Sequence, residues 1–191
     1  MLERLDQHLF LFLNSSNSPF WDQVMSIISG VITWFPLYIA ILIVLGFKYK
    51  RKFFVLILII IVAVTLSDQV SVLIKNGVHR LRPCHEPALD GLVHLVKAYC
   101  GGKYGFVSSH ASNSFMVATF SLLMIRRKWF SYSIIIWALI VGYSRIYLGV
   151  HYPGDVICGS LLGILVGWGV YKLYEVTDRR LLPRWKYFNQ V

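Results

Sequence analysis

The sequence predicts an all-α membrane protein: a polytopic bundle of five transmembrane helices with an N-terminal interfacial helix. Of its 191 residues, 57% are hydrophobic and only 15% are charged. Apolar runs recur at the length that a helix needs to cross a hydrocarbon core about 30 Å thick. Helices are favoured because an open sheet would leave backbone groups unpaired in lipid. The length predicts a single domain over residues 1–191.

Five apolar segments are long enough to be transmembrane spans. They are predicted at residues 25–47, 53–75, 109–125, 129–146 and 154–174. The apolar segment 3–13 is too short to cross a bilayer. We expect it to lie in the interface as a helix that ends at the Asn- and Pro-containing turn 14–19.

The cations predict how the helices are oriented. The net charge is +10, from 19 Lys and Arg against 9 Asp and Glu. Three basic regions fall on the same side of a five-span model, which the positive-inside rule makes cytoplasmic; they contain Lys48, Lys50, Arg51 and Lys52, then Arg126, Arg127 and Lys128, then Lys172, Arg179, Arg180, Arg184 and Lys186. The loop 76–108 and the turn 147–153 then face the periplasm. Because the cations are scattered over helix ends, a nucleic-acid partner is not expected.

Three polar clusters lie on the predicted outer side, each at the end of a predicted helix. Charged groups at such positions are costly unless they have a function. Together the clusters supply several cations, two histidines and one acid, a set suited to binding a phosphate and breaking its ester or anhydride bond. Their members are Lys75 with Arg82-Pro83, then Ser108-Ser109-His110, then Ser144-Arg145 with His151 and Asp155.

The third cluster pairs an imidazole with a carboxylate. Pro153 suits the first position of a helix, which places Asp155 in its first turn, four residues after His151. The carboxylate can accept a hydrogen bond from one imidazole nitrogen and leave the other free as a nucleophile. The alternative is an Asp155 that caps the helix beside an interfacial histidine.

The second cluster begins a predicted helix. Ser108 is a candidate N-cap, and the free N–H groups that follow favour an anion. His110 in the first turn can donate a proton to a leaving oxygen. The alternative for these residues is plain capping and an interfacial histidine.

The first cluster follows the second predicted span. Arg82 offers a planar fork for two phosphate oxygens, whereas Lys75 offers a point charge. The alternative is that both are flanking cations that extend to the interface. Asp68, seven residues before Lys75, needs a partner inside the membrane; supporting the site, pairing with a cation of another helix, and structural packing all fit.

The outer loop carries two cysteines and several possible metal ligands. Cys84 and Cys100 can form a disulfide in an oxidising periplasm, or they can be two free thiols. The other polar residues follow no ligand spacing, so we predict no metal site; they are His79, Arg80, His85, Glu86, Asp90 and His94.

The three clusters resemble, in order and spacing, the signature of the type 2 phosphatidic acid phosphatase family of membrane lipid phosphatases. They cover residues 75–155 and read Lys75-NGVHRL-Arg82-Pro83, Val107-Ser108-Ser109-His110, and Ser144-Arg145-IYLGV-His151-YPG-Asp155. The second motif departs from the usual Pro-Ser-Gly-His at Val107 and Ser109. We expect this departure to change the shape of the pocket rather than the chemistry.

The resemblance implies a role for each matching residue. His151 would be the nucleophile that forms a phosphohistidine, Asp155 would orient it, and His110 would protonate the leaving group. The phosphate would be held by Lys75, Arg82 and Arg145, together with Ser108 and the Ser109 backbone N–H. The family works without a metal or other cofactor.

We therefore expect a lipid phosphatase of the bacterial inner membrane, with its active site facing the periplasm and a lipid phosphate or diphosphate as substrate. Undecaprenyl diphosphate is the first choice, and lipid A and phosphatidylglycerol phosphate are the alternatives. A transporter of anionic lipids would use the same cations without bond cleavage, and a non-catalytic binding protein would need neither histidine. The sequence predicts no particular oligomeric state.

Overall fold

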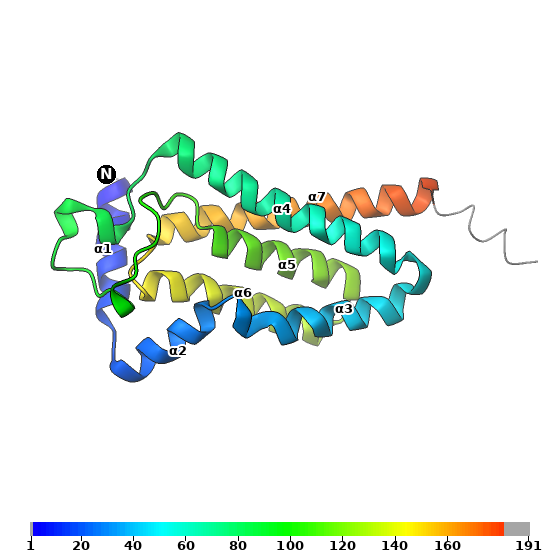
Figure 1. Ribbon diagram of the computed structural model, residues 1–191, viewed down its shortest axis with the longest axis horizontal. Helices are drawn as coiled ribbons and strands as arrows, with labels where there is room; N and C mark the ends of the chain where they lie inside the picture. Colours follow the sequence, from blue (N-terminus) through cyan, green and yellow to red (C-terminus); the bar gives the residue numbers. More distant parts are fainter. Residues whose placement is uncertain (1, 182–191) are drawn as a thin grey trace, which may run out of the picture.

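A computed structural model describes residues 2–181, and the helices that it contains confirm the all-α class (Figure 1). Arg184 and Lys186 of the third basic region lie outside the described residues. The helices are α1 (Leu2–Ser15), α2 (Pro19–Ser29), α3 (Phe35–Tyr49), α4 (Phe53–Val78), α5 (Ser109–Ile125), α6 (Lys128–Tyr147) and α7 (Pro153–Leu181), with short 3-10 turns between several of them.

The predicted span 25–47 begins too early, because the structure breaks this segment into two helices and the candidate span starts at Ile32. Gly30 ends α2, and its backbone N–H donates to the Ile27 carbonyl at 3.0 Å. The Thr33 hydroxyl also donates to the Ile27 carbonyl, and the Trp34 indole donates to the Ile28 carbonyl, each at 2.7 Å. These bonds satisfy carbonyls that a continuous helix would have used, so α3 starts afresh five residues later.

Within the described residues, four helical segments are long and apolar enough to cross a membrane, not the five predicted. They are Ile32–Tyr49, Phe53–Val78, Lys128–Tyr147 and Pro153–Asp178. The remaining predicted span, α5, has the expected bounds but only 17 residues. At 1.5 Å per residue it is about 26 Å long, which is short of the hydrocarbon core.

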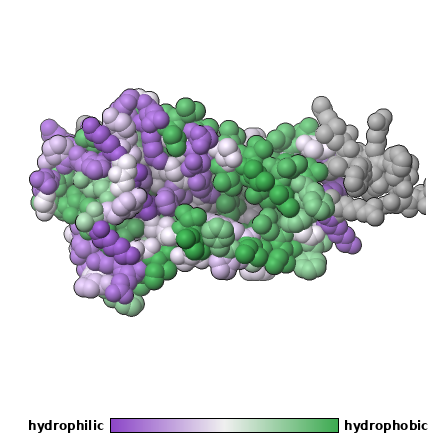
Figure 2. All heavy atoms as spheres, viewed as in Figure 1, coloured by the Kyte–Doolittle hydropathy of each residue, from purple (hydrophilic) through white to green (hydrophobic). Residues whose placement is uncertain are grey.

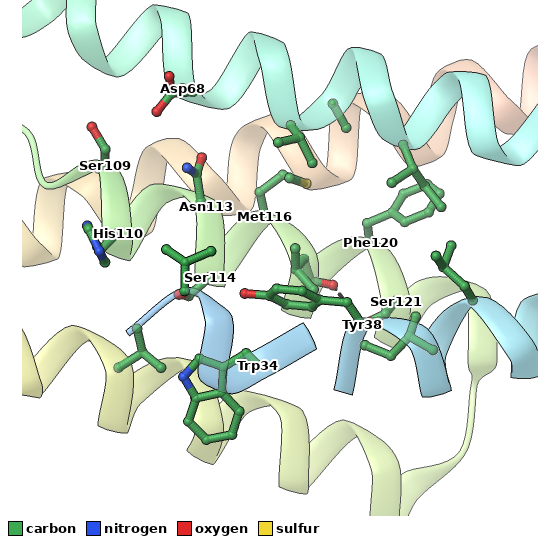
Figure 3. Close-up of a pocket in the computed structure, with 18 of the residues that line it drawn as sticks. Trp34, Tyr38, Asp68, Ser109, His110, Asn113, Ser114, Met116, Phe120 and Ser121 are labelled. Atoms are coloured by element: carbon green, nitrogen blue, oxygen red, sulfur yellow. Dashed lines mark hydrogen bonds between the residues drawn. The ribbon is translucent and has the colours of Figure 1, made fainter. Parts of the chain in front are cut away.

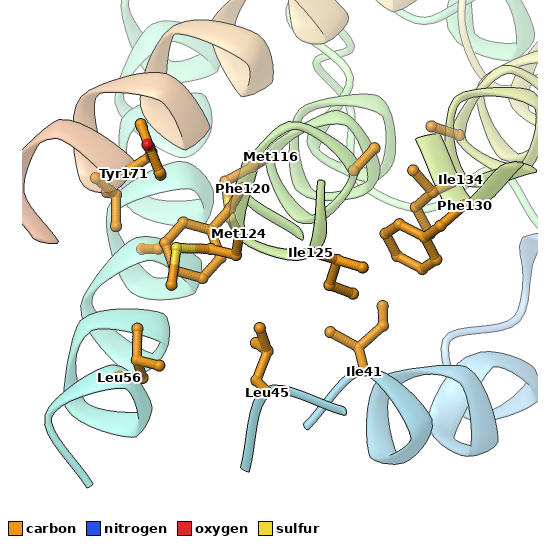
Figure 4. Close-up of a cluster of buried hydrophobic side chains, with 14 of the residues drawn as sticks. Ile41, Leu45, Leu56, Met116, Phe120, Met124, Ile125, Phe130, Ile134 and Tyr171 are labelled. Atoms are coloured by element: carbon orange, nitrogen blue, oxygen red, sulfur yellow. The ribbon is translucent and has the colours of Figure 1, made fainter. Parts of the chain in front are cut away.

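α5 occupies the middle of the bundle and packs most extensively against α7 (Figure 1). The core lies mainly at the end of the bundle remote from α1, where side chains from five helices meet (Figure 4). Leu45 of α3, Leu56 of α4 and Met124 of α5 are fully buried there. This packing holds α5 in the centre of the bundle, so that its first turn lies at the end that carries α1.

The two ends of the molecule differ in character. α1 lies across one end, beside the 79–108 loop, and hydrophilic side chains gather there, whereas apolar side chains cover the visible side of the bundle (Figures 1 and 2). At the other end, Lys48 Nζ donates to the carbonyls of Met124 and Ile125, the last residues of α5, at 2.8 and 3.0 Å. α1 exposes Leu2, Leu5, Leu9 and Phe12 along one side. An apolar side of this kind favours a helix that lies in the membrane interface, which stays our prediction for α1.

Candidate active site

The three sequence clusters meet at the end of the bundle that carries α1. The last turns of α2, α4 and α6, the first turn of α5, the turn before α7 and the 79–108 loop surround a cavity of about 520 Å³. Six of the eight predicted site residues line it: Lys75, Arg82, Ser109, His110, Arg145 and His151. The other two, Ser108 and Asp155, are 0% exposed and do not line it.

His151 and Asp155 form a buried pair. His151 lies in the turn between α6 and α7, and its Nδ1 is 3.4 Å from Asp155 Oδ2. The same carboxylate oxygen accepts the Tyr152 backbone N–H at 3.0 Å. His151 is 2% exposed, so its ring is held between the carboxylate and the cavity. With Nδ1 toward Asp155, Nε2 is the nitrogen left for a substrate.

Ser108 caps α5 rather than lining the cavity. Its hydroxyl accepts the Ala111 N–H at 3.4 Å, and its own N–H donates to the Asp155 carbonyl at 3.0 Å. The second bond ties the start of α5 to the start of α7. It thereby fixes the distance between His110 and the His151–Asp155 pair.

Ser109, which stands where the family usually has glycine, bonds to two residues of α4. Its hydroxyl accepts a hydrogen bond from Lys75 Nζ and shares another with the Ser71 hydroxyl at 2.6 Å. The departure from glycine thus changes the surroundings of Lys75. A phosphate that binds Lys75 must share it with this hydroxyl.

The two arginines are held by the segments around them. Arg82 donates from Nε to the Tyr104 carbonyl at 3.2 Å and from NH1 to the Cys100 carbonyl at 3.1 Å. Arg145 donates to the Ser29 hydroxyl, while its buried Nε has no partner among the described residues. Three cations therefore converge on one cavity with donor capacity to spare, which is the requirement for binding a phosphate.

The electrostatics of this cavity act on His151. Burial lowers the pKa of the His151 imidazole well below its usual 6.5, and Arg82, Arg145 and Lys75 lower that pKa further. The imidazole is therefore neutral in the empty site at physiological pH. A neutral imidazole is the form that can attack phosphorus.

The outer loop contains a disulfide between Cys84 and Cys100, which the sequence left open. The Cα atoms are 6.0 Å apart, and the bridge closes a loop with a sequence separation of 16. Because the Cys100 carbonyl accepts from Arg82, the disulfide fixes an anchor of this arginine.

Replacing Cys84 and Cys100 together with serine is expected to lower the free energy of unfolding by about 3 kcal/mol, because a loop of this length is no longer constrained in the unfolded chain. Thermal unfolding in detergent checks this, with Cys158→Ser as the control because Cys158 is a free cysteine. Equal unfolding temperatures for the two variants would contradict the expectation.

A second cavity, of about 460 Å³, extends from the site into the bundle (Figure 3). It follows α5 from Ser109 and His110 to Phe120 and is walled by apolar side chains of α3 and α4. Asp68 of α4 also lines it. Asp68 makes no ion pair within the described part of the chain, so the pairing considered from the sequence is not formed there.

Sequence reasoning missed three residues beside the His151–Asp155 pair. Arg80, which the sequence placed only among outer-loop residues without a ligand spacing, donates to Asp155 and to Asp6 of α1. A Cβ at Gly105 would lie 3.0 Å from Asp155 Oδ2, so this position leaves no room for a side chain. The sequence offered a signal only for Arg80, which lies inside the first motif.

Known proteins share the sequence and the fold of this helix bundle with its cationic pocket. The model of the PAP2 superfamily matches residues 53–179. A lipid A 4'-phosphatase of Bacteroides thetaiotaomicron is 38% identical over 184 residues, which are 94% of this chain and 81% of that protein.

Two further proteins are similar over most of their length. The putative undecaprenyl-diphosphatase YbjG of Escherichia coli K12 is 26% identical over 195 residues, which cover 96% of this chain and 90% of that protein. The crystal structure of Aquifex aeolicus LpxE matches with a TM-score of 0.69 and 25% identity, covering 86% of this chain and 93% of that one.

The chain belongs to the PAP2 superfamily, and it is a bacterial integral membrane phosphatase that acts on lipids. The family predicted from the three motifs is thereby confirmed. Of these two relatives, the one with the higher identity is named for lipid A, which is the alternative substrate, and the more distant one is named for undecaprenyl diphosphate, the first choice. The comparisons favour that alternative over undecaprenyl diphosphate.

Proposed function

We propose that this protein removes a phosphate from lipid A, at the 4' position, through a phosphohistidine on His151. Support for the substrate comes from the identity of 38% with a lipid A 4'-phosphatase along 94% of the chain. Support for the chemistry comes from the two histidines and three cations that line one cavity, and from the Asp155 carboxylate that contacts His151 behind it.

The reaction takes two steps. The free nitrogen of His151 attacks phosphorus, an N–P bond forms, and the P–O bond to the lipid breaks while His110 gives its proton to the leaving oxygen. Water then attacks the phosphohistidine and passes a proton to His110. The N–P bond breaks, its electrons return to the imidazole, and inorganic phosphate leaves.

The remaining residues stabilise charge. Lys75, Arg82 and Arg145 face the phosphoryl oxygens, where charge is spread in the transition state. The negative charge of the bound phosphate also offsets these cations, which favours a protonated His110 in the complex. Asp155 keeps the proton on the nitrogen of His151 that does not react.

The observation that best supports a lipid substrate is that the cationic cavity continues into the apolar one. Ser29, Val31, Ser109 and His110 line both the cationic cavity and the apolar one. A molecule with a phosphate in the first and a hydrocarbon chain in the second would therefore pass His110 at the junction. A water-soluble phosphate would leave the apolar cavity without a function.

The site is proposed to face the periplasm. The basic residues Lys48, Lys52 and Lys128 lie at helix ends remote from the site, and the positive-inside rule makes that end cytoplasmic. The Cys84–Cys100 disulfide agrees, because disulfides persist in the periplasm rather than the cytosol.

Undecaprenyl diphosphate is the second candidate. It is favoured by the similarity to YbjG across 96% of the chain and by the apolar cavity beside the site, which suits one hydrocarbon chain. Phosphatidylglycerol phosphate has no such specific support.

Free phosphate release by the purified protein in detergent with EDTA tests the proposal. The panel contains lipid A, undecaprenyl diphosphate and phosphatidylglycerol phosphate, each with His151→Ala as the control. Fastest release from lipid A, with loss of its 4'-phosphate by mass spectrometry, is the expected result. No release from any lipid by the folded protein would instead favour a transporter of anionic lipids.

The neutral state of His151 in the empty site predicts the acid limb of the pH profile. Since kcat/KM reports groups of the free enzyme, and the pKa of His151 lies well below 6.5, the nucleophile stays active as the pH falls past 6.5. Because the substrate phosphate itself titrates at about pH 6, ¹⁵N-histidine NMR of the empty protein measures the protonation of His151 separately from that of the substrate. Protonation of His151 near pH 6.5 would contradict this expectation.

A further inference from the structure

Arg80 lies at the centre of a partly buried network, at the Asp155 carboxylate oxygen that does not face His151. Its NH1 donates to Asp155 Oδ1 at 2.8 Å, and its NH2 donates to Asp6 Oδ2, also at 2.8 Å. The guanidinium carbon is 4.2 Å from the centroid of the Tyr152 ring. Arg80 is thus held in the plane that its two carboxylate contacts require.

Asp6 brings α1 into this network. Its second oxygen accepts the Gly154 N–H in the first turn of α7 at 2.8 Å. A Cβ at Gly154 would lie only 2.6 Å from the Asp6 carboxylate, so glycine is needed for this approach. The carboxylate therefore bonds both to Arg80 and to the helix that carries Asp155.

α1 is fastened at a second point, two turns further along. Asn14 is 1% exposed, and its amide nitrogen donates to the carbonyls of Tyr147 and His94 at 2.8 and 3.0 Å. Its amide oxygen accepts the His94 N–H at 2.7 Å. Two polar contact points, a partly buried one at Asp6 and a buried one at Asn14, thus fix α1 across the α6–α7 turn, the segment that contains His151.

We propose that Arg80 and Asp6 are positioning residues that hold the Asp155 carboxylate in the orientation required by His151, and that α1 is thereby part of the active site. The inference rests on the proposed roles of His151 and Asp155. A carboxylate that is 0% exposed is stable in its charged form only with a charged, hydrogen-bonded partner. Arg80 is that partner, and Asp6 fixes the other half of its fork.

The charge of Arg80 supports this role. Burial opposes the charged form, but the Asp155 and Asp6 carboxylates outweigh it and raise the pKa of Arg80 above its usual value. Other titratable groups near Asp155 come from every neighbouring element; they are Lys75 of α4, Arg82 of the outer loop, His110 of α5, His151 and Tyr152 of the α6–α7 turn, and Cys158 of α7. Neither Lys75 nor Arg82 makes an ion pair with Asp155 in the described structure, whereas Arg80 does.

The test measures kcat, KM and the pH profile of Arg80→Gln, Arg80→Lys and Asp6→Asn in the full-length protein. For Arg80→Gln we expect kcat to fall about 10²-fold, the order of magnitude for a misplaced catalytic group. KM should change little, because Arg80 does not line the phosphate cavity. The acid limb of kcat/KM should move to higher pH, because Asp155 without its cation takes up a proton more readily. Arg80→Lys keeps the charge and should restore the position of that limb.

Asp6→Asn keeps Arg80 in place, so it tests the network even if Arg80→Gln does not fold. We expect a smaller fall in kcat, and no further loss when Asp6→Asn is added to Arg80→Gln, because Asp6 acts through Arg80. Glu3→Gln is the matched control, since Glu3 is an exposed acid on the same helix.

Wild-type kcat and pH profiles in folded Arg80→Gln and Asp6→Asn would overturn the inference, as would an equal loss in Glu3→Gln. Additive losses in the double variant would indicate a merely structural role for α1 and overturn it as well. The His151→Ala variant separates this outcome from failure of the proposed function. If His151→Ala loses phosphate release while the Arg80 and Asp6 variants keep it, the proposed function stands and only the role of α1 fails.

Discussion

His151→Ala is expected to lower phosphate release by roughly 10⁴-fold or more, the loss seen when a nucleophile that acts as one unit with its neighbours is removed. The imidazole is the one candidate nucleophile that lines the cationic cavity while its other nitrogen faces a carboxylate, Asp155, among the described residues. Alanine at 151 leaves the three cations in place. Substrate binding should therefore survive while turnover stops.

Trapping of the intermediate gives the decisive measurement. Substrate labelled with ³²P is mixed with the protein and quenched in base, in which phosphohistidine is stable. The wild type should carry label and His151→Ala should carry none. His8→Ala serves as the control, because His8 lies exposed on α1. A base-stable labelled protein from His151→Ala would show that another residue is the nucleophile.

Much of the bundle was predictable because its signals are local. α5 has the bounds that were predicted, since Ser108 caps its start and Arg126 ends it in a left-handed conformation. The break between α2 and α3 was not predicted, because hydropathy does not register that the Thr33 and Trp34 side chains satisfy carbonyls of the preceding helix. The reduced span count has a different origin: α5 has the predicted bounds, but its 17 residues are about one turn short of the hydrocarbon core.

The site was predictable where a motif fixes the spacing and not where the partner is distant in sequence. His151 and Asp155 are four residues apart, so their contact follows from a helix start. Arg80 has no such neighbour: its partners Asp155 and Asp6 lie 75 and 74 residues away. Its significance appears only when α1 folds back across the bundle. The apolar cavity is likewise formed by residues of five helices, α2 to α6, so no single segment of the sequence predicts it.

The contact between α5 and α7 depends on three glycines spaced four residues apart, Gly159, Gly163 and Gly167. A Cβ at Gly163 would lie 2.1 Å from the Ser112 carbonyl oxygen and 2.9 Å from the Met116 backbone nitrogen. Both atoms belong to the α5 backbone, so neither can move aside without moving the helix. Small residues at such a spacing allow close approach of membrane helices, which then associate through packing.

Gly163→Ala is therefore expected to lower the free energy of unfolding by about 3 kcal/mol, the upper part of the range for overpacking a tight contact. Gly169→Ala is the matched control, because a Cβ there meets nothing within 4 Å. In a helix interior, alanine is better than glycine by about 0.5–1 kcal/mol, so the control should be slightly stabilised. The two substitutions should change the free energy of unfolding in opposite directions. The difference between them separates the effect of packing from that of helix propensity.

Activity should fall along with stability in Gly163→Ala. α5 and α7 carry His110 and Asp155 in their first turns, and the Ser108 N–H donates to the Asp155 carbonyl across the same contact at 3.0 Å. Pushing the helices apart at Gly163 stretches this bond and separates the proton donor from the His151–Asp155 pair. Thermal unfolding in detergent and kcat on the lipid substrate, measured for both variants, check the two effects. Equal unfolding temperatures for Gly163→Ala and Gly169→Ala would mean that α5 and α7 are not in backbone contact, and that the alignment of the two histidines depends on the turns alone.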